Sequence, residues 1–456
     1  MVVIMKIFVL KQEKAIGYLE ETLVNEISFI YFDNIEKDEY LPGLTLKINY
    51  SDNGLFNIFH NFLPENEQLR LLRKNNHINN NIEILLHLKD IHGSYQFLNE
   101  EDYTAYDFKE ERSLYLYNDI KDDMLNSNYT YPNILDNYKL DIHKNKIFPQ
   151  NAVNEKEIGL SGFQYKFGVS LDNDDKIVYI DENKKSSYFM KPYSLYYSQF
   201  CKTKDKDRLY IPYLLINEHL FMTLARDIGF TVPYNAIIKD GADYHYIIKR
   251  FDRYKNGSFD HEEFATLMGY NSNQKYNSSV IEVLNKASEY VNENKLRELL
   301  RFFFFSIIIS HGDLHSKNIS LINISNNTKE QNKDLAPYYD ISTTSIYKGI
   351  DNKDIGLKIG NKKSKIKKVD FINIADKFNI LDFEKDMKEI VSFFSNNFKT
   401  YIQKLPSDIK QLPFYTGRLS SHRSLEAYLL KYYDNRIKYI QKYIDNSWIT
   451  DKDDIF

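Results

Sequence analysis

One stretch decides the fold: Ser310-His311-Gly312-Asp313-Leu314-His315-Ser316-Lys317-Asn318. It follows an apolar run typical of a buried helix, Leu299 to Ile309, and precedes a run typical of a strand, Ile319 to Ile322. A kinase catalytic loop has this spacing: the Asp orients the acceptor hydroxyl, and the Asn further along ligates Mg²⁺. A turn with a solvated Asp is the alternative for the short triplet alone, but the nine-residue context favours a catalytic loop. We therefore predict that Asp313 is catalytic, that Asn318 binds metal and that Lys317 neutralises charge on the phosphoryl group.

A second metal ligand is predicted at Asp340. It lies in the stretch from Leu335 to Ser342, which follows an Asn-rich loop, and we expect a strand that ends at this Asp. Kinases place a metal-binding carboxylate just after the catalytic loop, and Mg²⁺ prefers hard oxygen ligands. Taken alone, Asp340 would be read as a turn or helix-capping residue. Paired with Asn318, it is a candidate magnesium ligand.

The phosphate side of such a site needs a cation on a strand. Tyr188-Phe189-Met190-Lys191 places Lys191 at the end of an apolar strand, and Glu218 follows in a predicted helix, Pro212 to Ile228. A Lys–Glu pair that holds the α- and β-phosphates is a standard part of a kinase. A surface lysine and an exposed glutamate are the alternative for each residue alone. With the catalytic loop present, we predict that the two residues form the ATP-binding pair.

A glycine-containing stretch, Gly159 to Phe167, is the candidate for a loop that covers the phosphates. It includes Ser161, Gly162 and Gln164, and glycine permits close approach of the backbone to phosphate. The stretch is not a Walker motif, and by itself it is weak evidence. We assign these three residues to ATP binding on the strength of the other motifs.

The order of elements predicts an α+β protein with a two-lobed, protein-kinase-like catalytic domain. Residues 1–110 are expected to form a small α+β subdomain, 111–150 a connection, 151–255 a β-rich lobe and 256–456 a helical lobe. The hairpin signal Asp240-Gly241 lies inside the β-rich lobe, and amphipathic helices are expected over Phe383–Lys404 and Ser424–Ser447.

Bulk properties limit the choice of partners and compartment. The net charge of −4 gives no global basic field, so neither direct nucleic-acid binding nor a membrane partner is expected. The single cysteine, Cys201, excludes an intrachain disulfide and fits a reducing compartment, and the longest apolar run, Phe302 to Ile309, is too short for a membrane helix. We expect a cytoplasmic protein. The lysines between Lys362 and Lys368 are read as a solvated loop, with a contact to tRNA or to an acidic substrate as the alternative.

Taken in order, these segments resemble the HipA family of toxin kinases over nearly the whole chain. The resemblance is carried by six segments: Ser161-Gly162-Phe163-Gln164-Tyr165-Lys166, Phe189-Met190-Lys191, Asn217-Glu218, Lys249-Arg250-Phe251-Asp252-Arg253, Asp313 to Asn318, and Tyr339-Asp340. Asn61 to Asn66 also resembles the N-terminal subdomain of that family.

The resemblance implies a serine/threonine kinase that uses ATP and Mg²⁺. It implies that Asp313 is the catalytic Asp, that Asn318 and Asp340 hold Mg²⁺, and that Lys191 binds phosphate. It adds an interlobe hinge whose backbone meets adenine around Lys249 and Phe251. Family members phosphorylate proteins such as aminoacyl-tRNA synthetases, and many are neutralised by a DNA-binding HipB-type antitoxin.

Two departures from the family pattern leave alternatives open. Gly159 stands where relatives often carry an autophosphorylated serine, so Ser161 is the remaining candidate for autophosphorylation. His311-Gly312 before Asp313 is closer to small-molecule phosphotransferases of the aminoglycoside-kinase type. A small-molecule kinase and a catalytically weak pseudokinase scaffold are therefore the alternatives to a protein kinase.

Overall fold

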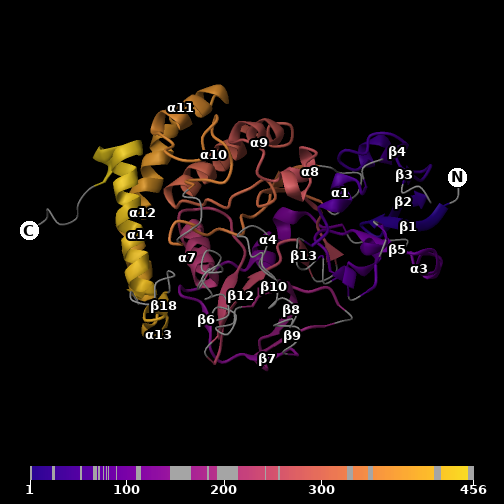
Figure 1. Ribbon diagram of the computed structural model, residues 1–456, viewed down its shortest axis with the longest axis horizontal. Coiled ribbons are helices and arrows are strands. Elements are labelled where there is room, and N and C mark those ends of the chain that lie inside the picture. Colours follow the sequence, from indigo (N-terminus) through magenta and orange to yellow (C-terminus); the bar gives the residue numbers. More distant parts are fainter. Residues whose placement is uncertain are drawn as a thin grey trace, which may run out of the picture.

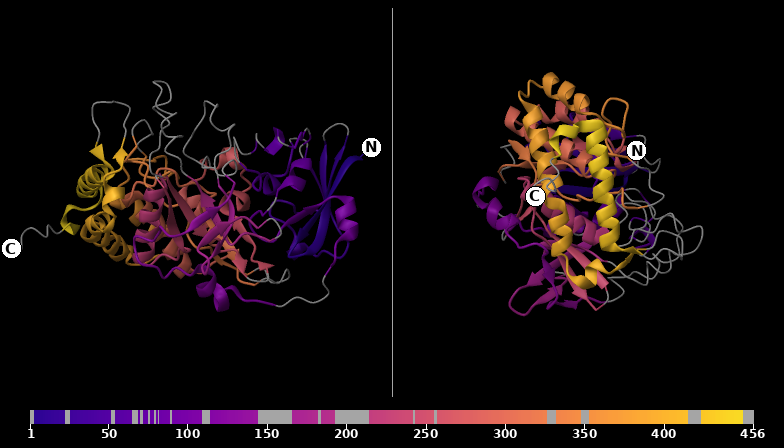
Figure 2. Two further views of the ribbon diagram at one scale, coloured as in Figure 1. Left: turned by 90° about the horizontal axis from the view of Figure 1, so that it is seen from below. Right: turned by 90° about the vertical axis from the view of Figure 1, so that its left-hand side faces the viewer.

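The computed structural model describes residues 3–22, 26–51, 54–64, 69, 72–74, 76–78, 80, 82–88, 90–108, 114–143, 166–181, 184–192, 214–241, 243–254, 257–325, 332–347, 353–414 and 423–449. An N-terminal sheet lies at one end of the long axis, and the helices α12 (Phe383–Lys404) and α14 (Leu425–Tyr439) lie at the other (Figure 1). Figure 2 shows the same order from below. In the described residues, no helix is long and apolar enough to cross a membrane.

The N-terminal sheet is antiparallel and has the order β4-β3-β2-β1-β5. Its strands are β1 (Val3–Lys11), β2 (Lys14–Thr22), β3 (Ile27–Tyr31), β4 (Ile48–Ser51) and β5 (Gln96–Leu98). The short helices η1 (Lys37–Glu39), α1 (Asn57–His60), η2 (Glu83–His87) and α3 (Glu100–Ala105) accompany it. Alternating residues such as Ile7, Val9 and Leu19 are fully buried, which gives this sheet a hydrophobic core of its own.

A second sheet has seven strands in the order β6-β11-β12-β10-β8-β9-β7. They are β6 (Ile134–Leu135), β7 (Lys139–Asp141), β8 (Phe167–Asp172), β9 (Ile177–Tyr179), β10 (Tyr188–Lys191), β11 (Asn235–Asp240) and β12 (Asp243–Lys249). The hairpin between β11 and β12 turns at Gly241, whose φ of +60° suits glycine. The helix α7 (Leu214–Asp227) packs against β11 and β12.

The remaining part is mainly helical. Besides α12 and α14 it contains α8 (Phe264–Leu267), η5 (Ser272–Gln274), α9 (Val280–Ala287), α10 (Glu293–Ile308), α11 (Lys368–Lys377), α13 (Ser407–Lys410), the π-helical turn η6 (Ile440–Ile444) and η7 (Asn446–Trp448). Short strands complete it: β13 (Arg253–Tyr254), β14 (Gly257–Ser258), β15 (His261–Glu263), β16 (Ser320–Asn323), β17 (Lys333–Leu335), β18 (Pro413–Phe414) and β19 (Arg423–Ser424).

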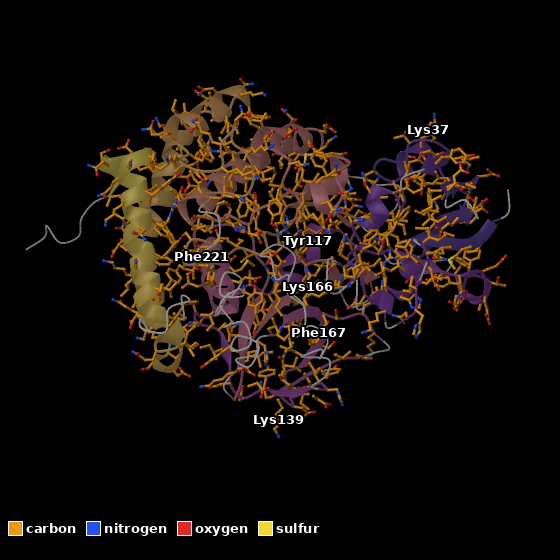
Figure 3. The ribbon with its side chains drawn as sticks, viewed as in Figure 1. Lys37, Tyr117, Lys139, Lys166, Phe167 and Phe221 are labelled. Carbon is orange, nitrogen blue, oxygen red and sulfur yellow. The ribbon has the colours of Figure 1, made fainter. Side chains whose placement is uncertain are left out.

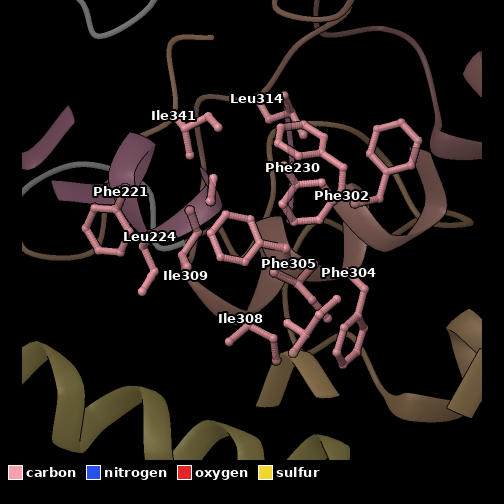
Figure 4. Close-up of a cluster of buried hydrophobic side chains, with 14 of the residues drawn as sticks. Phe221, Leu224, Phe230, Phe302, Phe304, Phe305, Ile308, Ile309, Leu314 and Ile341 are labelled. Atoms are coloured by element: carbon pink, nitrogen blue, oxygen red, sulfur yellow. The ribbon is translucent and has the colours of Figure 1, made fainter. Parts of the chain in front are cut away.

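The helix α10 lies at the centre of the largest core. Every residue from Phe302 to Ile309 is fully buried, so this end of the helix is surrounded by protein on all sides. Figure 4 shows its side chains gathered with Phe221 and Leu224 of α7 and with Phe230. Because α10 cannot shift without disturbing this core, the loop that follows it has a rigid start.

Charged side chains join the N-terminal sheet to the rest of the molecule. The β1–β2 turn places Gln12 and Glu13 at positive φ, as a tight hairpin turn requires, and the Gln12 side chain donates to the Ser258 carbonyl at 2.9 Å. Lys11 lies 3.8 Å from a carboxylate oxygen of Asp260. The turn therefore meets the segment that follows the second sheet.

A buried arginine makes the other half of this junction. Arg250 donates to the carboxylate of Asp90 at 2.8 Å, to the carbonyl of Ile91 at 2.9 Å and to the carboxylate of Asp252 at 2.9 Å. It also reaches Ser186, which lies just before β10. One guanidinium thus binds the N-terminal subdomain, the second sheet and the segment that leads into the helical part.

Two expectations from the sequence differ in detail. No strand ends at Asp340: β17 stops at Leu335, and Asp340 has a φ of +60°. Within the expected connection, 111–150, the helix α4 (Tyr117–Leu125) forms and β6 and β7 join the second sheet, because their apolar residues pair with its edges.

Candidate active site

The catalytic-loop stretch follows α10 and leads into β16. Ser310 has a φ of +55°, and the N–H of His311 donates to the carbonyl of Ser306 at 2.8 Å, which closes the end of the helix. His311 and Leu314 are buried, whereas Asp313 is half-buried. The sharp turn after a rigid helix therefore presents Asp313 toward the surface. Its Oδ1 accepts a hydrogen bond from the hydroxyl of Tyr276.

Lys191 lies at the centre of the site. Its Nζ is 2.7 and 2.8 Å from the two carboxylate oxygens of Glu218 in α7 and 2.6 Å from Oδ1 of Asp340. The contact joins the second sheet, its helix and the segment after β17. The structure thus brings the predicted pair of Lys191 and Glu218 together with Asp340, which the sequence singled out separately.

Burial and charge act on the three groups in different directions. Burial disfavours a charged Lys191, but the carboxylates of Asp340 and Glu218 outweigh it and raise the pKa of Lys191. Burial also opposes the charge of Asp340, yet Lys191 and then Lys166 lower the pKa of that carboxyl. For Glu218 burial prevails and raises its pKa to about 7, against the attraction of Lys191. The surplus of carboxylate around one ammonium keeps Lys191 charged.

The helix that carries Glu218 is fixed to the Asp340 segment by the preceding residue. The side chain of Asn217 donates to the carbonyl of Thr343 at 2.8 Å and accepts from the N–H of Thr343 at 3.2 Å. Asn217 is buried, so both halves of its amide are satisfied by one backbone position. The two neighbouring residues thus have complementary roles: Asn217 fixes the position of α7, and Glu218 binds Lys191.

Asn318 and Asp340 lie within hydrogen-bond distance of each other. Asn318 donates to Oδ2 of Asp340 at 2.9 Å, and its own side-chain oxygen accepts from the N–H of His315 at 3.2 Å. Amide and carboxylate oxygens are the hard ligands that Mg²⁺ prefers, and Mg²⁺ takes few of them from protein. Among the described residues, no cluster of three or more His, Cys, Asp or Glu suits a metal. The pair fits a nucleotide-bound Mg²⁺ better than a metal enclosed by protein alone.

At the end of β12 and just after it, the backbone groups are available to a ligand, whereas the side chains are engaged elsewhere. The side chain of Lys249 points to α4, where its Nζ donates to the carbonyl of Asp123 at 2.9 Å. Lys249 donates its own N–H to the carbonyl of Tyr234, which lies opposite it on the neighbouring segment. The N–H of Tyr234, however, donates to the carbonyl of Leu125 at 2.8 Å, so the carbonyl of Lys249 does not accept a hydrogen bond from Tyr234 in return. Within the described residues, the N–H of Phe251 makes no backbone hydrogen bond either.

The Phe251 side chain is buried beside Tyr339, with ring centroids 5.5 Å apart. It therefore packs in the interior instead of reaching into a cleft. The predicted contact with adenine rests on backbone groups alone.

The other predicted residues fall in two groups. Lys317 is half-buried, with its Nζ 3.2 Å from the hydroxyl of Ser272 and 3.9 Å from a carboxylate oxygen of Glu263. Ser161, Gly162 and Gln164 lie outside the described residues, as does Gly159. The described chain resumes at Lys166 and Phe167, which Figure 3 places near the middle of the molecule.

Sequence reasoning missed two residues of this region. Tyr276 contacts Asp313, but a tyrosine in a loop carries no local signal for such a role. Arg250 was noted only as part of a hinge motif, and its partner Asp90 is 160 residues away in the chain. Nothing in a linear pattern links residues at that separation.

The family model for the HipA-like C-terminal domain matches residues 158–402, just over half of the chain. The chain belongs to this family. The match contains the lysine, the glutamate, the catalytic loop and Asp340, and it agrees with the HipA-type kinase resemblance seen in the sequence.

Curated relatives of this HipA-like chain are described as kinases. It is 27% identical over 215 residues to a putative kinase from Haemophilus influenzae, which covers 43% of this chain and 56% of that protein. It is 29% identical over 175 residues to a putative kinase from Sinorhizobium fredii, covering 35% and 42%. The chain spans about half the length of the curated relatives it matches.

A solved structure shares the fold over the whole length. The complex of HipA, HipB and operator DNA from Shewanella oneidensis contains a chain that superimposes with a TM-score of 0.67 and 14% identity, over 97% of this chain and 99% of that one. The predicted fold class, a two-lobed kinase-like domain preceded by a small α+β domain, is confirmed.

Proposed function

We propose that this HipA-like chain is an ATP- and Mg²⁺-dependent kinase that phosphorylates serine or threonine hydroxyls of a cellular protein. One observation carries the proposal: a single ammonium, Lys191, is bound by carboxylates from α7 and from the segment after β17. Two carboxylates hold this buried cation at 2.6–2.8 Å, but desolvation offsets much of their attraction, so the group contributes little net stability. Buried charges of this kind are typical of functional sites. A nucleotide phosphate is the anion that such a lysine receives in kinases.

Each residue has a distinct role in the proposed mechanism. Lys191 binds the α- and β-phosphates while Glu218 holds its ammonium in place. Asn318 and Asp340 hold Mg²⁺, which neutralises charge on the phosphates when bound. Asp313 orients the acceptor hydroxyl and takes its proton. Phosphoryl transfer needs mainly positioning and charge, and these groups supply both.

The remaining roles concern the nucleotide and its loop. The Lys249 carbonyl would accept from the adenine amino group, and the Phe251 N–H would donate to the ring. Lys317 would face the transferring phosphoryl group, and the loop with Ser161, Gly162 and Gln164 would cover the phosphates. Phosphate on Ser161 would add about −1.5 to −2 charge where ATP must bind, so we include self-inactivation through Ser161 in the proposal.

Partners are proposed from the family alone. The solved relative is a complex of HipA with HipB and operator DNA, which supports a HipB-type antitoxin as a partner of this chain. An aminoacyl-tRNA synthetase is the first candidate for the protein substrate. The domain boundaries of the sequence prediction, with lobes at 151–255 and 256–456, are retained as part of this proposal.

The test is transfer from radiolabelled ATP to three acceptor sets: cell lysate, small alcohols and aminoglycosides. We expect labelled protein from the wild type and a loss of about 10²–10⁴-fold in Asp313→Asn, since loss of a catalytic base has this effect. Asp174→Asn, in the exposed β8–β9 turn, is the matched control and should transfer normally. Mass spectrometry of the same samples would report phosphate on Ser161.

The assay distinguishes the three candidate functions: protein kinase, small-molecule kinase and pseudokinase. Label in aminoglycosides but not in protein would favour the small-molecule kinase. ATP binding without transfer to any acceptor would favour the pseudokinase. Equal transfer by Asp313→Asn and the wild type would refute the assignment of the catalytic residue.

A further inference from the structure

Tyr276 contacts the proposed catalytic residue directly. It lies between η5 and α9, and its hydroxyl donates a hydrogen bond to Oδ1 of Asp313. The two residues are 37 positions apart, so the contact depends on how the loop that contains Tyr276 docks on the catalytic loop. The kinase roles given above do not use this residue.

The loop that carries Tyr276 contacts the catalytic loop through the backbone of Lys275 and through the tyrosine ring. The carbonyl of Lys275 accepts from the N–H of Ser316 at 3.2 Å and from its hydroxyl at 3.0 Å. The tyrosine ring packs edge-on against His315, with centroids 5.1 Å apart and an interplanar angle of 83°. Lys275, His315 and Ser316 are all buried.

A lysine from a third segment completes the support. Lys363 donates to the carbonyl of Tyr276 at 3.1 Å, and its Nζ lies 5.5 Å from the centroid of the tyrosine ring. The backbone of Lys353 in the same region approaches Gly312, beside Asp313, and accepts from the hydroxyl of Ser310 at 3.0 Å. Lys353 thus lies against the catalytic loop and Lys363 against Tyr276, so Tyr276 is held from two directions.

We propose that Tyr276 is a positioning residue that fixes the carboxylate of Asp313 for its contact with the acceptor hydroxyl. The inference rests on the proposed kinase function and deepens it. A phenol is neutral near pH 7, so it can hold one carboxylate oxygen without removing the negative charge that attracts the acceptor proton. A lysine at this position would hold the same oxygen but would neutralise that charge. The anchored backbone makes Tyr276 a fixed support for Asp313.

The competing role is that of a removable plug, in which the tyrosine hydroxyl occupies the place of the acceptor. A plug has to leave for each turnover. Tyr276 could leave with its loop only if the contacts of its backbone, of its ring and of the neighbouring Lys275 all broke, and rotation of the side chain alone would still break the ring contact with the buried His315. The geometry therefore favours permanent positioning, and the two roles predict opposite effects when the hydroxyl is removed.

The test compares Tyr276→Phe with Tyr290→Phe, a matched control whose tyrosine is 37% exposed beyond the end of α9. We expect kcat of Tyr276→Phe to fall about tenfold, the effect of one hydrogen bond to a charged group, while the KM for ATP stays unchanged. The acid limb of the pH profile of kcat should also move to higher pH, because a donated hydrogen bond stabilises the carboxylate form. Lys363→Gln, which removes the support under Tyr276, should lower kcat by about two- to threefold.

Other results would overturn the inference. A raised kcat or a lowered KM for the protein acceptor in Tyr276→Phe would identify a plug, and phosphate on Tyr276 in mass spectrometry would identify an acceptor. Unchanged kcat and pH profile would leave no role for the hydroxyl. Failure of the kinase function itself is distinguishable, because the wild type would then bind ATP without transferring phosphate to any acceptor, whatever stands at position 276.

Discussion

At the scale of single residues, the site is defined by a charge imbalance. Two carboxylates surround one ammonium, and the side chains of Lys191 and Glu218 are only 8% and 2% exposed. The side chain of Asp340 is 38% exposed and can exchange its lysine contact for water or a ligand. Lys191 and Glu218 are therefore the more buried members of this group of three, and Asp340 is the most exposed.

This division predicts the behaviour of Lys191→Met. The variant leaves Glu218 buried without its cation, and breaking a buried pair from one side costs about 3–5 kcal/mol in the free energy of unfolding. Phosphoryl transfer should be lost as well. Urea unfolding and the radiolabel assay measure the two effects.

The double variant Lys191→Met/Glu218→Gln is the control. Removal of both charges should restore most of the stability, while transfer stays absent because phosphate loses its ligand. Equal stability of the single and double variants would contradict the buried-pair interpretation.

At the scale of elements, the junction between the N-terminal subdomain and β15 contains an unusual histidine pair. The rings of His92 and His261 lie 4.5 Å apart, centroid to centroid, and their four nitrogens are buried without hydrogen bonds from the described residues. Phe62 and Phe251 pack on the outer faces of the pair. The environment suits two neutral rings and disfavours imidazolium.

The pair predicts that acid weakens this junction. Burial and then the charge of its neighbour lower the pKa of His92 well below 6.5, and burial also lowers that of His261. A histidine that is neutral when folded binds fewer protons than when unfolded, so its stabilising contribution is complete above pH 6.5 and is lost as the pH falls. His92 should therefore contribute to a loss of stability as the pH falls from 6.5 towards 5.

Urea unfolding from pH 7.5 to pH 5, with the wild type beside His92→Phe/His261→Phe, measures this effect. The double variant keeps the ring packing and should lose less stability in acid than the wild type. The comparison is needed because Glu218 acts in the opposite sense: its raised pKa removes stability as the pH rises from about 4.5 to about 7. Parallel pH profiles for both proteins would contradict the prediction.

The sequence predicted those parts of the site that are local. Asp313 and Asn318 share one loop, and α12 was predicted with its observed bounds because its apolar residues recur at helical spacing. The long-range parts were not predictable. Tyr276 and Arg250 acquire their contacts from docking between distant segments, and Asp340 takes a positive φ where a strand was expected. Composition and periodicity record burial but not which distant residue is a partner.

At the scale of the whole molecule, buried arginines join the N-terminal subdomain to the kinase-like part. Arg250 is fully buried and its guanidinium binds Asp90, Ile91 and Asp252, while Arg253 also donates to the carbonyl of Gly93 at 2.5 Å. These contacts surround the segment whose backbone is proposed to meet adenine. The subdomain therefore contacts the chain on either side of Phe251 through these two arginines.

Arg250→Met should uncouple the two parts. It leaves Arg253, 3.5 Å from Asp90 and 3.4 Å from Asp252, as the remaining cation for both carboxylates, and we expect a loss of up to about 3–5 kcal/mol. Hydrogen exchange should become faster in β1 and β2 than in α10, whereas in the wild type both are protected by the same global unfolding. The single tryptophan, Trp448, reports the helical end by fluorescence.

The control for this prediction is Lys286→Met, which removes an exposed pair with Glu289 within α9 and the turn that follows it. Such a surface pair contributes less than about 1 kcal/mol, so exchange should keep its wild-type pattern. If exchange in β1 of Arg250→Met remained as slow as in α10, the junction would not depend on this arginine.

The shared guanidinium has a consequence for recombination among relatives. A chimaera that joined the first hundred residues of one homologue to the catalytic part of another would bring together an acid and a base selected in different proteins. Such a hybrid should keep the stability of its parents only when residues equivalent to Asp90 and Arg250 are inherited together, so lineages in which one of them has changed should show a compensating change in the other.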